Sequence, residues 1–213
     1  MPARDSTRRA LTPEQLKLSN ALALAHEQQG VRSVLVTSLD EGAGVTSVCV
    51  ALARGLSWDQ KQKVLLLEAN LYHPCLQRIF NLTAREEART SFEHYNLLKM
   101  AMATGSPNLQ VIAVGKGISE IVLEPRRLAA ALPALHDSFD FIVIDAPSVS
   151  LNPEIVLLSA HVDRVVLVVE EGRTRIQKVE TLIAELVRAR AELLGIVLNR
   201  ESKHLPDIVE KWL

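Results

Sequence analysis

The sequence predicts a three-layer α/β fold in which a mainly parallel central sheet is flanked by helices. Six short runs rich in Val, Ile and Leu alternate with stretches of helical spacing. The runs are almost continuously apolar, as strands covered on both faces require. The chain has 213 residues, 48% of them hydrophobic, which is enough for one core and too apolar for a disordered chain. We therefore expect a single domain over residues 12–213, after a flexible arm at residues 1–11.

A helix is expected to open the domain. Thr12 supplies an N-cap, Pro13 a first-turn proline and Gln15 the third position of a capping box. Apolar residues then recur at helical spacing until Gly30 ends the element. These apolar residues are Leu18, Leu22 and Ala25.

The strands follow at regular intervals. They are expected at Ser33–Thr37, Val64–Glu68, Leu109–Val114, Phe141–Asp145, Val165–Val169 and Leu194–Asn199. Between the last two, apolar residues repeat every three or four positions and predict an amphipathic crossover helix. Its apolar residues are Ile176, Val179, Ile183, Leu186 and Val187. Residues 81–108 fit the pattern least, and we expect a mobile helical or irregular excursion there.

Composition excludes several classes of protein. The formal net charge of −1 gives no global positive field to hold nucleic acid. Cys49 and Cys75 form no CxxC pair, so neither a disulfide framework nor a zinc site is indicated, and a reducing cytoplasm is favoured. His73 beside Cys75 has no matching partners for a metal site. The longest apolar runs fall far short of the roughly 18 residues of a membrane span, so this chain is not expected to cross a membrane.

The loop after the first expected strand carries the clearest chemical signal. In an open parallel sheet this loop is the favoured phosphate cradle, because its amides precede a helix N-terminus. A phosphate-binding P-loop needs glycines, a lysine for the phosphates and a Ser or Thr for Mg²⁺. Gly42, Gly44, Thr46 and Ser47 stand where they should, whereas Val45 takes the place of the lysine.

Five segments in order extend this signal to nearly the whole chain: VLVTS…EGAGVTS, VLLLEANLYHP, FDFIVIDAP, VDRVVLVVEEG and LLGIVLNR. This frame resembles the bacterial tyrosine-kinase (BY-kinase) family, the cytoplasmic domains paired with capsule and exopolysaccharide co-polymerases. The family belongs to the MinD/ParA-like P-loop group, so the resemblance implies the three-layer P-loop NTPase fold. It covers about residues 12–213.

Several family motifs are altered in this chain. The family P-loop reads roughly PGEGK[TS]T, and Glu41, Ala43 and Val45 depart from it. The family's second strand ends in DxDxR, whose carboxylates position Mg²⁺ and act in phosphoryl transfer. The residues at those three places are Glu68, Asn70 and Tyr72. Asn70 cannot be anionic, and Tyr72 cannot pair a phosphate bidentately. Glu68 is interpreted as a relic or salt-bridge partner, with a catalytic base as the alternative.

Other family positions are kept in part. Asp145 matches the aspartate that holds Mg²⁺, and its alternative role is to hydrogen bond the loop Ser or Thr. The metal set, should nucleotide bind, is therefore Thr46 and Asp145. Asn199 and Arg200 stand where family members contact adenine. The candidate residues of a residual nucleotide site are Gly42, Ala43, Gly44, Val45, Thr46, Ser47, Asn199 and Arg200. The loop is either this residual site for ATP or ADP with Mg²⁺, held weakly, or a structural turn, and the sequence does not separate the two.

Two terminal motifs of the family are also degraded. Its ring-assembly helix carries ExxRxxR, and the residues here are Glu14, Lys17 and Asn20, which weakens the case for a homo-oligomer. Active members end in a tyrosine cluster, but the only tyrosines are Tyr72 and Tyr95, and Tyr95 is read as an ordinary residue rather than a phosphorylation site. The C-terminus instead has an apolar stripe that packs on the domain or docks on a partner. The stripe is Ile208, Val209, Trp212 and Leu213.

The resemblance with these departures implies a catalytically inactive domain. It would regulate or scaffold exopolysaccharide or capsule synthesis and export, bound to a Wzz-like membrane polysaccharide co-polymerase or its cytoplasmic segment. Its location would be cytoplasmic and peripheral at the inner membrane. The alternative is an ATPase or tyrosine kinase that uses Glu68 and Asp145 and takes a missing cation from a partner subunit. A MinD/ParA-like positioning protein is a weaker alternative, because the loop lacks that group's signature lysine.

Overall fold

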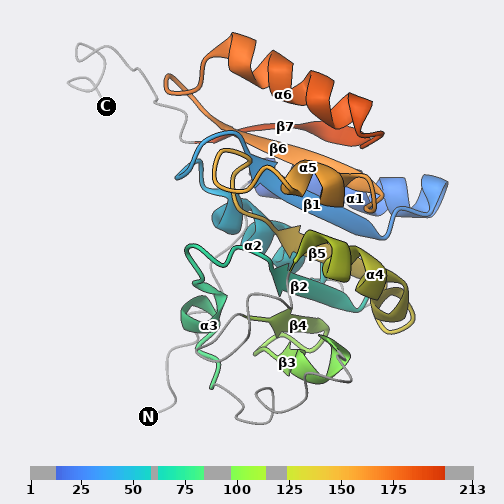
Figure 1. Ribbon diagram of the computed structural model, residues 1–213. Helices are drawn as coiled ribbons and strands as arrows, with labels where there is room; N and C mark the ends of the chain where they lie inside the picture. Colours follow the sequence, from blue (N-terminus) through green and yellow to red (C-terminus); the bar gives the residue numbers. More distant parts are fainter. Residues whose placement is uncertain (1–12, 59–61, 84–96, 114–123, 200–213) are drawn as a thin grey trace, which may run out of the picture.

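The computed structural model describes residues 13–58, 62–83, 97–113 and 124–199. They form a seven-stranded sheet in the order β3-β4-β2-β5-β1-β6-β7, parallel except where β3 meets β4. The strands are β1 (Ser33–Ser38), β2 (Val64–Glu68), β3 (Met102–Ala103), β4 (Leu109–Ile112), β5 (Phe141–Asp145), β6 (Arg164–Glu170) and β7 (Leu193–Asn199). The predicted fold class is confirmed (Figure 1).

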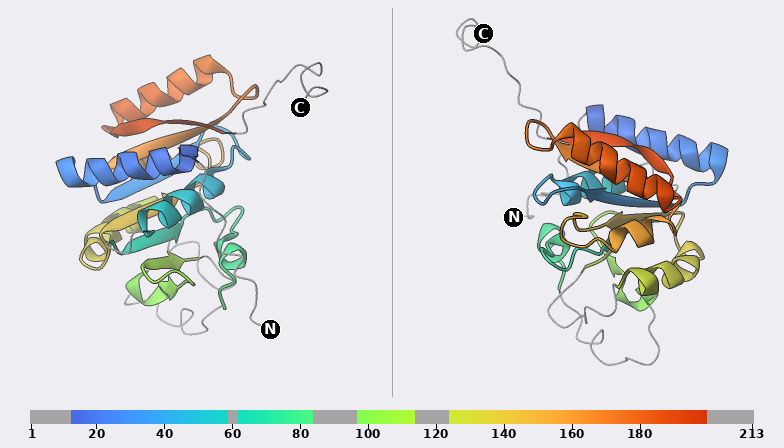
Figure 2. Two further views of the ribbon diagram at one scale, coloured as in Figure 1. Left: turned by 180° about the vertical axis from the view of Figure 1, so that it is seen from behind. Right: turned by 45° about the horizontal axis from the view of Figure 1, so that its top comes forward.

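Helices cover both faces of the sheet (Figure 2). They are α1 (Pro13–Gln29), α2 (Val45–Leu56), α3 (Leu76–Ile79), α4 (Pro125–His136), α5 (Ile155–Ser159) and α6 (Ile176–Arg188), with a 3₁₀ turn, η2, at Leu97–Met100. Helices α1 and α2 pack on one face and α4, α5 and α6 on the other, each against a separate apolar cluster. Because both faces are covered, the side chains of β1, β2 and β5 are buried along their whole length, which explains their continuous apolar runs.

The start of β1 is held by the carboxylate of Asp163, which lies 130 positions after Ser33 in the sequence. Asp163 Oδ2 accepts hydrogen bonds from the Arg32 and Ser33 backbone N–H groups and from Ser33 Oγ, each at 2.8 Å. Burial alone would raise the pKa of Asp163, but these donors hold it below its usual value. The contact ties β1 to the turn before β6.

The predicted amphipathic crossover helix is confirmed as α6, between β6 and β7. Its buried residues are Val179, Leu182 and Leu186, whereas Ile176 is 72% exposed and Val187 61% exposed. The apolar repeat thus extends beyond the narrow face that the helix turns to the sheet. The predicted excursion missed β3, which pairs antiparallel with β4. Residues 1–12, which include the predicted arm and N-cap, and residues 84–96 lie outside the described residues.

Candidate functional site

A cleft of about 480 Å³ opens at the carboxyl ends of β1, β2 and β5. Three segments line it: the β1–α2 loop, the stretch between β2 and α3, and the turn after β5. The sequence predicts the first segment as the phosphate loop, and the structure brings all three together. The lining residues include Glu41, Gly42, Gly44, Val45, Thr46, His73, Cys75 and Arg78.

The β1–α2 loop has the backbone of a phosphate cradle. Gly42 and Gly44 adopt φ values of 81° and 91°, in the left-handed region that favours glycine. Gly44 is the N-cap of α2, and no side chain caps that turn in the described structure. The amides at the start of α2 therefore remain available to an anion, as in helix N-terminal sites generally.

Asn199, predicted as an adenine contact, holds this loop from the end of β7. Its Nδ2 donates a hydrogen bond of 2.8 Å to the Ala43 carbonyl. A Cβ placed on Gly44 would clash with the same nitrogen, and the φ of 91° would strain any other residue there. Asn199 thus acts as a strut for the loop. Its predicted neighbour Arg200 lies outside the described residues.

Val45 and Thr46 form the first turn of α2. Val45, at the position of the family lysine, is 9% exposed and packs in the apolar cluster between α1, α2 and the sheet. Thr46 lies between Asp145 and Cys75. Burial raises the pKa of both groups, and hydrogen bonding to the Thr46 hydroxyl opposes that rise in each. The hydroxyl needed for a Mg²⁺ site is in place, and the cation needed for phosphate is absent from position 45.

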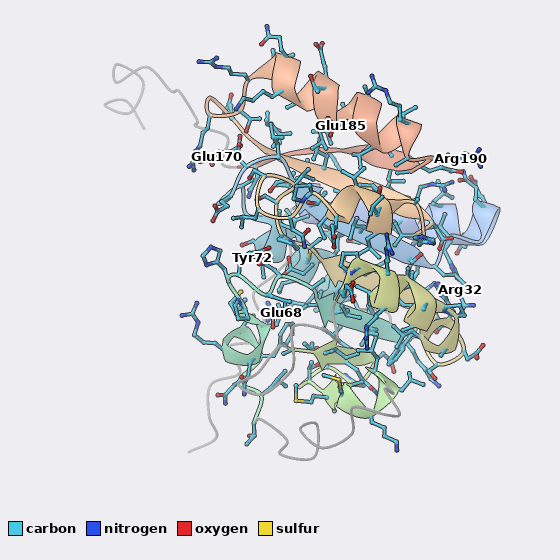
Figure 3. All side chains as sticks on the ribbon, in the orientation of Figure 1. Arg32, Glu68, Tyr72, Glu170, Glu185 and Arg190 are labelled. Atoms are coloured by element: carbon cyan, nitrogen blue, oxygen red, sulfur yellow. The ribbon has the colours of Figure 1, made fainter. Side chains whose placement is uncertain are left out.

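Glu68 is fully buried at the end of β2 and has a structural task. Its Oε1 accepts hydrogen bonds from the backbone N–H groups of Cys75 at 2.5 Å and Leu76 at 2.8 Å. The carboxylate therefore fixes the chain entering α3 to the sheet. Figure 3 shows Glu68 inside the fold and Tyr72 at the outer rim of the same end of the sheet.

Asp145 is the register partner of Glu68 on the neighbouring strand, and its side chain is also fully buried. Its Oδ1 accepts from the Cys49 thiol at 3.7 Å, while Oδ2 has no hydrogen-bond partner among the described residues. Burial, with the nearby charge of Glu68, raises the pKa of Asp145 to about 7, against the opposing effects of Thr46 and Cys49. An orphaned carboxylate oxygen behind Thr46 fits a cation-binding role, as predicted for these two residues.

At the mouth of the cleft lies a pair of residues that sequence reasoning missed. Glu41 of the loop lies 3.0 Å from His73 Nε2, across 32 positions of the chain. Asn70 Oδ1 accepts from the backbone N–H groups of Tyr72 and His73, which makes the turn that presents the histidine. Asn70 and Tyr72 therefore shape this rim.

Two arginines near the loop were also missed. Arg78 of α3 lines the cleft. Arg173, after β6, has its Nη1 3.5 Å from where a Cβ on Gly42 would stand, and the same nitrogen pairs with Glu170 at 3.2 Å. Neither belongs to a family motif, and only the tertiary structure brings them near the loop.

Comparison with solved structures identifies the fold. The crystal structure of the chimerical protein CapA2B2 superposes with a TM-score of 0.77 at 24% identity, covering 93% of this chain and 88% of that one. The septum site-determining protein MinD of Pyrococcus horikoshii, complexed with Mg-ADP, gives 0.68 at 21% identity, covering 85% and 76%. The fold is thus that of MinD-like P-loop NTPases. No family model matches the sequence.

Sequence relatives support the resemblance to bacterial tyrosine kinases. A "Tyrosine-protein kinase CpsD" of Streptococcus agalactiae is 27% identical over 172 residues, 79% of this chain and 75% of its own length. The "Tyrosine-protein kinase YwqD" of Bacillus subtilis is 24% identical over 212 residues, 92% and 85% of the two chains. The chain is similar to bacterial tyrosine kinases over most of its length. The resemblance stated from the five segments is confirmed.

Several predicted features lie outside the described residues. They are Tyr95, the C-terminal stripe and the side chain of Glu14. Lys17 and Asn20 are exposed on α1. Cys49 is buried beside Asp145, and Cys75 is partly exposed in the cleft; both are free thiols. Over the described part of the chain, no helix is long and apolar enough to cross a bilayer, and no group of three or more His, Cys, Asp or Glu could hold a metal.

Proposed function

We propose that this chain, which is similar to bacterial tyrosine kinases, lacks kinase chemistry and regulates or scaffolds exopolysaccharide or capsule synthesis and export. Its partner would be a membrane polysaccharide co-polymerase, which holds the domain at the inner membrane. One observation carries the proposal. The position of the phosphate-binding lysine is occupied by an apolar residue, Val45, which packs in the core at the start of α2.

The charges around the cleft support the loss of activity. Arg78 is the only described lining residue with a permanent positive charge. Glu41 stands in the phosphate loop, and Glu68 and Asp145 lie beneath it. Phosphoryl transfer depends on neutralising charge on phosphate oxygens. Removing one such partner typically costs about 2–4 kcal/mol of transition-state stabilisation, or roughly 10²–10³ in rate.

Calorimetric titration with Mg-ADP and Mg-ATP tests this reading, with Val45→Lys as the matched variant. We expect little or no heat from the native chain and a clear binding isotherm from V45K, because the glycine loop, Thr46 and Asp145 remain in place. Tight binding by the native chain would contradict an abandoned site. Binding by neither protein would mean that the Glu41–His73 contact or the core at position 45 keeps nucleotide out, and E41Q combined with V45K separates these causes.

The scaffold role needs a test of its own. The purified domain should bind the cytoplasmic segment of the co-polymerase encoded in the same genome. Thr46→Ala should leave this affinity unchanged, because the role uses no nucleotide chemistry. Absence of binding, or a large loss on T46A with the fold intact, would contradict the scaffold.

A second function is favoured by the preserved loop geometry. The left-handed glycines, the uncapped turn of α2 and the orphaned Asp145 oxygen would suit an ATPase or kinase that is completed by a partner's cation. Glu68 is less suited to act as the base, since its Oε1 already accepts two backbone hydrogen bonds. Nucleotide turnover that appears only when the partner is added would establish this alternative.

A further inference from the structure

Exposed apolar side chains gather at one edge of the sheet. Of the ten large apolar side chains that are exposed in the described structure, four lie on the last two elements, α6 and β7. They are Ile176 (72% exposed), Val187 (61%), Ile196 (49%) and Leu198 (54%). A contiguous apolar surface of this kind marks an interaction site.

These four side chains face the same side. Ile196 and Leu198 are in register with Leu167 and Val169 of β6, so they lie on the sheet face that α6 covers. Connections between parallel neighbours such as β6 and β7 are right-handed, and α-helices are right-handed too. The buried side of α6 faces the sheet. From that side, residues that lie about 90° further along the right-handed turn of the helix point toward the open edge of the sheet beyond β7.

Ile176, Ile183 and Val187 occupy that flank of α6. Ile183 is half-buried, and the other two are exposed. We name the surface made by Ile176, Ile183, Val187, Ile196 and Leu198 the edge strip. It runs along α6 for about 20 Å, from the carboxyl end of β7 toward its start.

Strand β7 is also an unprotected edge. It pairs only with β6 in the described sheet, and its sequence LLGIVLN has neither a charge nor a proline. Natural edge strands usually carry such residues, or are covered by another segment, because an open apolar edge promotes aggregation. We therefore expect another polypeptide segment to cover the edge strip.

We propose that the edge strip is covered by the chain's own residues 205–213. Their apolar residues follow the i, i+3, i+4, i+7, i+8 spacing of one helix face, with a proline at the second position where a first turn accepts it. These residues are Leu205, Ile208, Val209, Trp212 and Leu213. The charged Asp207, Glu210 and Lys211 fall on the other face.

The tether makes this segment the favoured occupant. Only residues 200–204 separate the end of β7 from Leu205. Extended, this link spans about 20 Å, enough to turn back onto Leu198 and Ile176 at the same end of the sheet. A tethered segment also has a high effective concentration, which a second copy of the chain lacks at ordinary dilution.

Trp212 provides a direct probe, because the chain has only one other tryptophan. In a Trp58→Phe background, Trp212 fluorescence should be blue-shifted relative to a peptide of residues 200–213 and poorly quenched by iodide. Leu198→Asp on the strip and Ile208→Asp in the tail should each shift the emission to the red and raise quenching several-fold. The matched control, Leu24→Asp, lies on α1 over the other sheet face and is 51% exposed in the native chain, so it should change neither.

The possible results distinguish the chain's own tail from a second copy of the chain as the segment that covers the edge strip. Trp212 emission that equals that of the free peptide in the W58F protein would overturn the proposal. Shielding that disappears on hundredfold dilution, with a change in sedimentation, would show a second copy on the strip and also overturn it. Ile208 is not among the described residues that form the core. The I208D result can therefore be interpreted even where L198D fails to fold.

Discussion

Asp145→Asn should stabilise the protein at alkaline pH, although it changes a residue at the base of the cleft. The Asp145 side chain is fully buried, one of its oxygens has no hydrogen-bond partner in the described structure, and its pKa is raised from 3.8 to about 7. Ionising it in the folded state is therefore costly. Asparagine has nearly the same shape and never ionises.

The size of the effect follows from proton linkage. A folded-state pKa above the unfolded value gives stability that is fully present below pH 3.8 and is lost as the pH rises to about 7. The loss is about 1.4 kcal/mol per pH unit and about 4 kcal/mol in total. The D145N protein should thus exceed the native chain by a few kcal/mol at pH 8, and the difference should vanish near pH 4.

Urea unfolding of both proteins between pH 4 and pH 8 measures this difference. Asp163→Asn is the matched control with the opposite sign, because three donors stabilise the Asp163 carboxylate and hold its pKa low. That change should cost about 1–3 kcal/mol at neutral pH, and the cost should fade as the pH falls through the folded-state pKa. A D145N protein less stable than the native chain at pH 8 would refute the reasoning, since it would mean that the carboxylate is ionised and compensated.

Two further substitutions test the loop and its supports. Gly44→Ala should destabilise the domain by about 1–3 kcal/mol, because φ is 91° and the new Cβ would meet Asn199; an unchanged urea midpoint would contradict the strut. Glu68→Gln should cost about 1–2 kcal/mol and speed proteolysis between β2 and α3, because a neutral acceptor holds the Cys75 and Leu76 amides less strongly; undiminished stability with normal proteolysis would remove the structural role given to Glu68.

Sequence reasoning reached the strands whose burial is continuous. Val64–Glu68 and Phe141–Asp145 were placed to the residue, because a strand covered on both faces has an unbroken apolar run. The two residues of β3 carry no such signal, and they become a strand only through pairing with β4. The apolar spacing predicted the helix α6, but it did not show which of the apolar residues the sheet covers, because periodicity does not give the width of the buried face.

The site was predictable where its chemistry is local. The glycine loop and the absent lysine can be read within a few residues of one another. The support of Ala43 by Asn199 joins residues 156 apart, and the Glu41–His73 contact joins two loops. Such contacts depend on which strands become neighbours, so no local pattern predicts them. The orphaned oxygen of Asp145 likewise arises from packing.

The central claim is that a chain similar to bacterial tyrosine kinases has lost phosphoryl transfer. The most direct test incubates the purified chain with Mg-ATP and follows both phosphotyrosine, by mass spectrometry, and ADP release, with T46A as the background. We predict no phosphotyrosine on Tyr72 or Tyr95 and no ADP release above that of T46A. Phosphotyrosine, or turnover that T46A abolishes, would contradict the account.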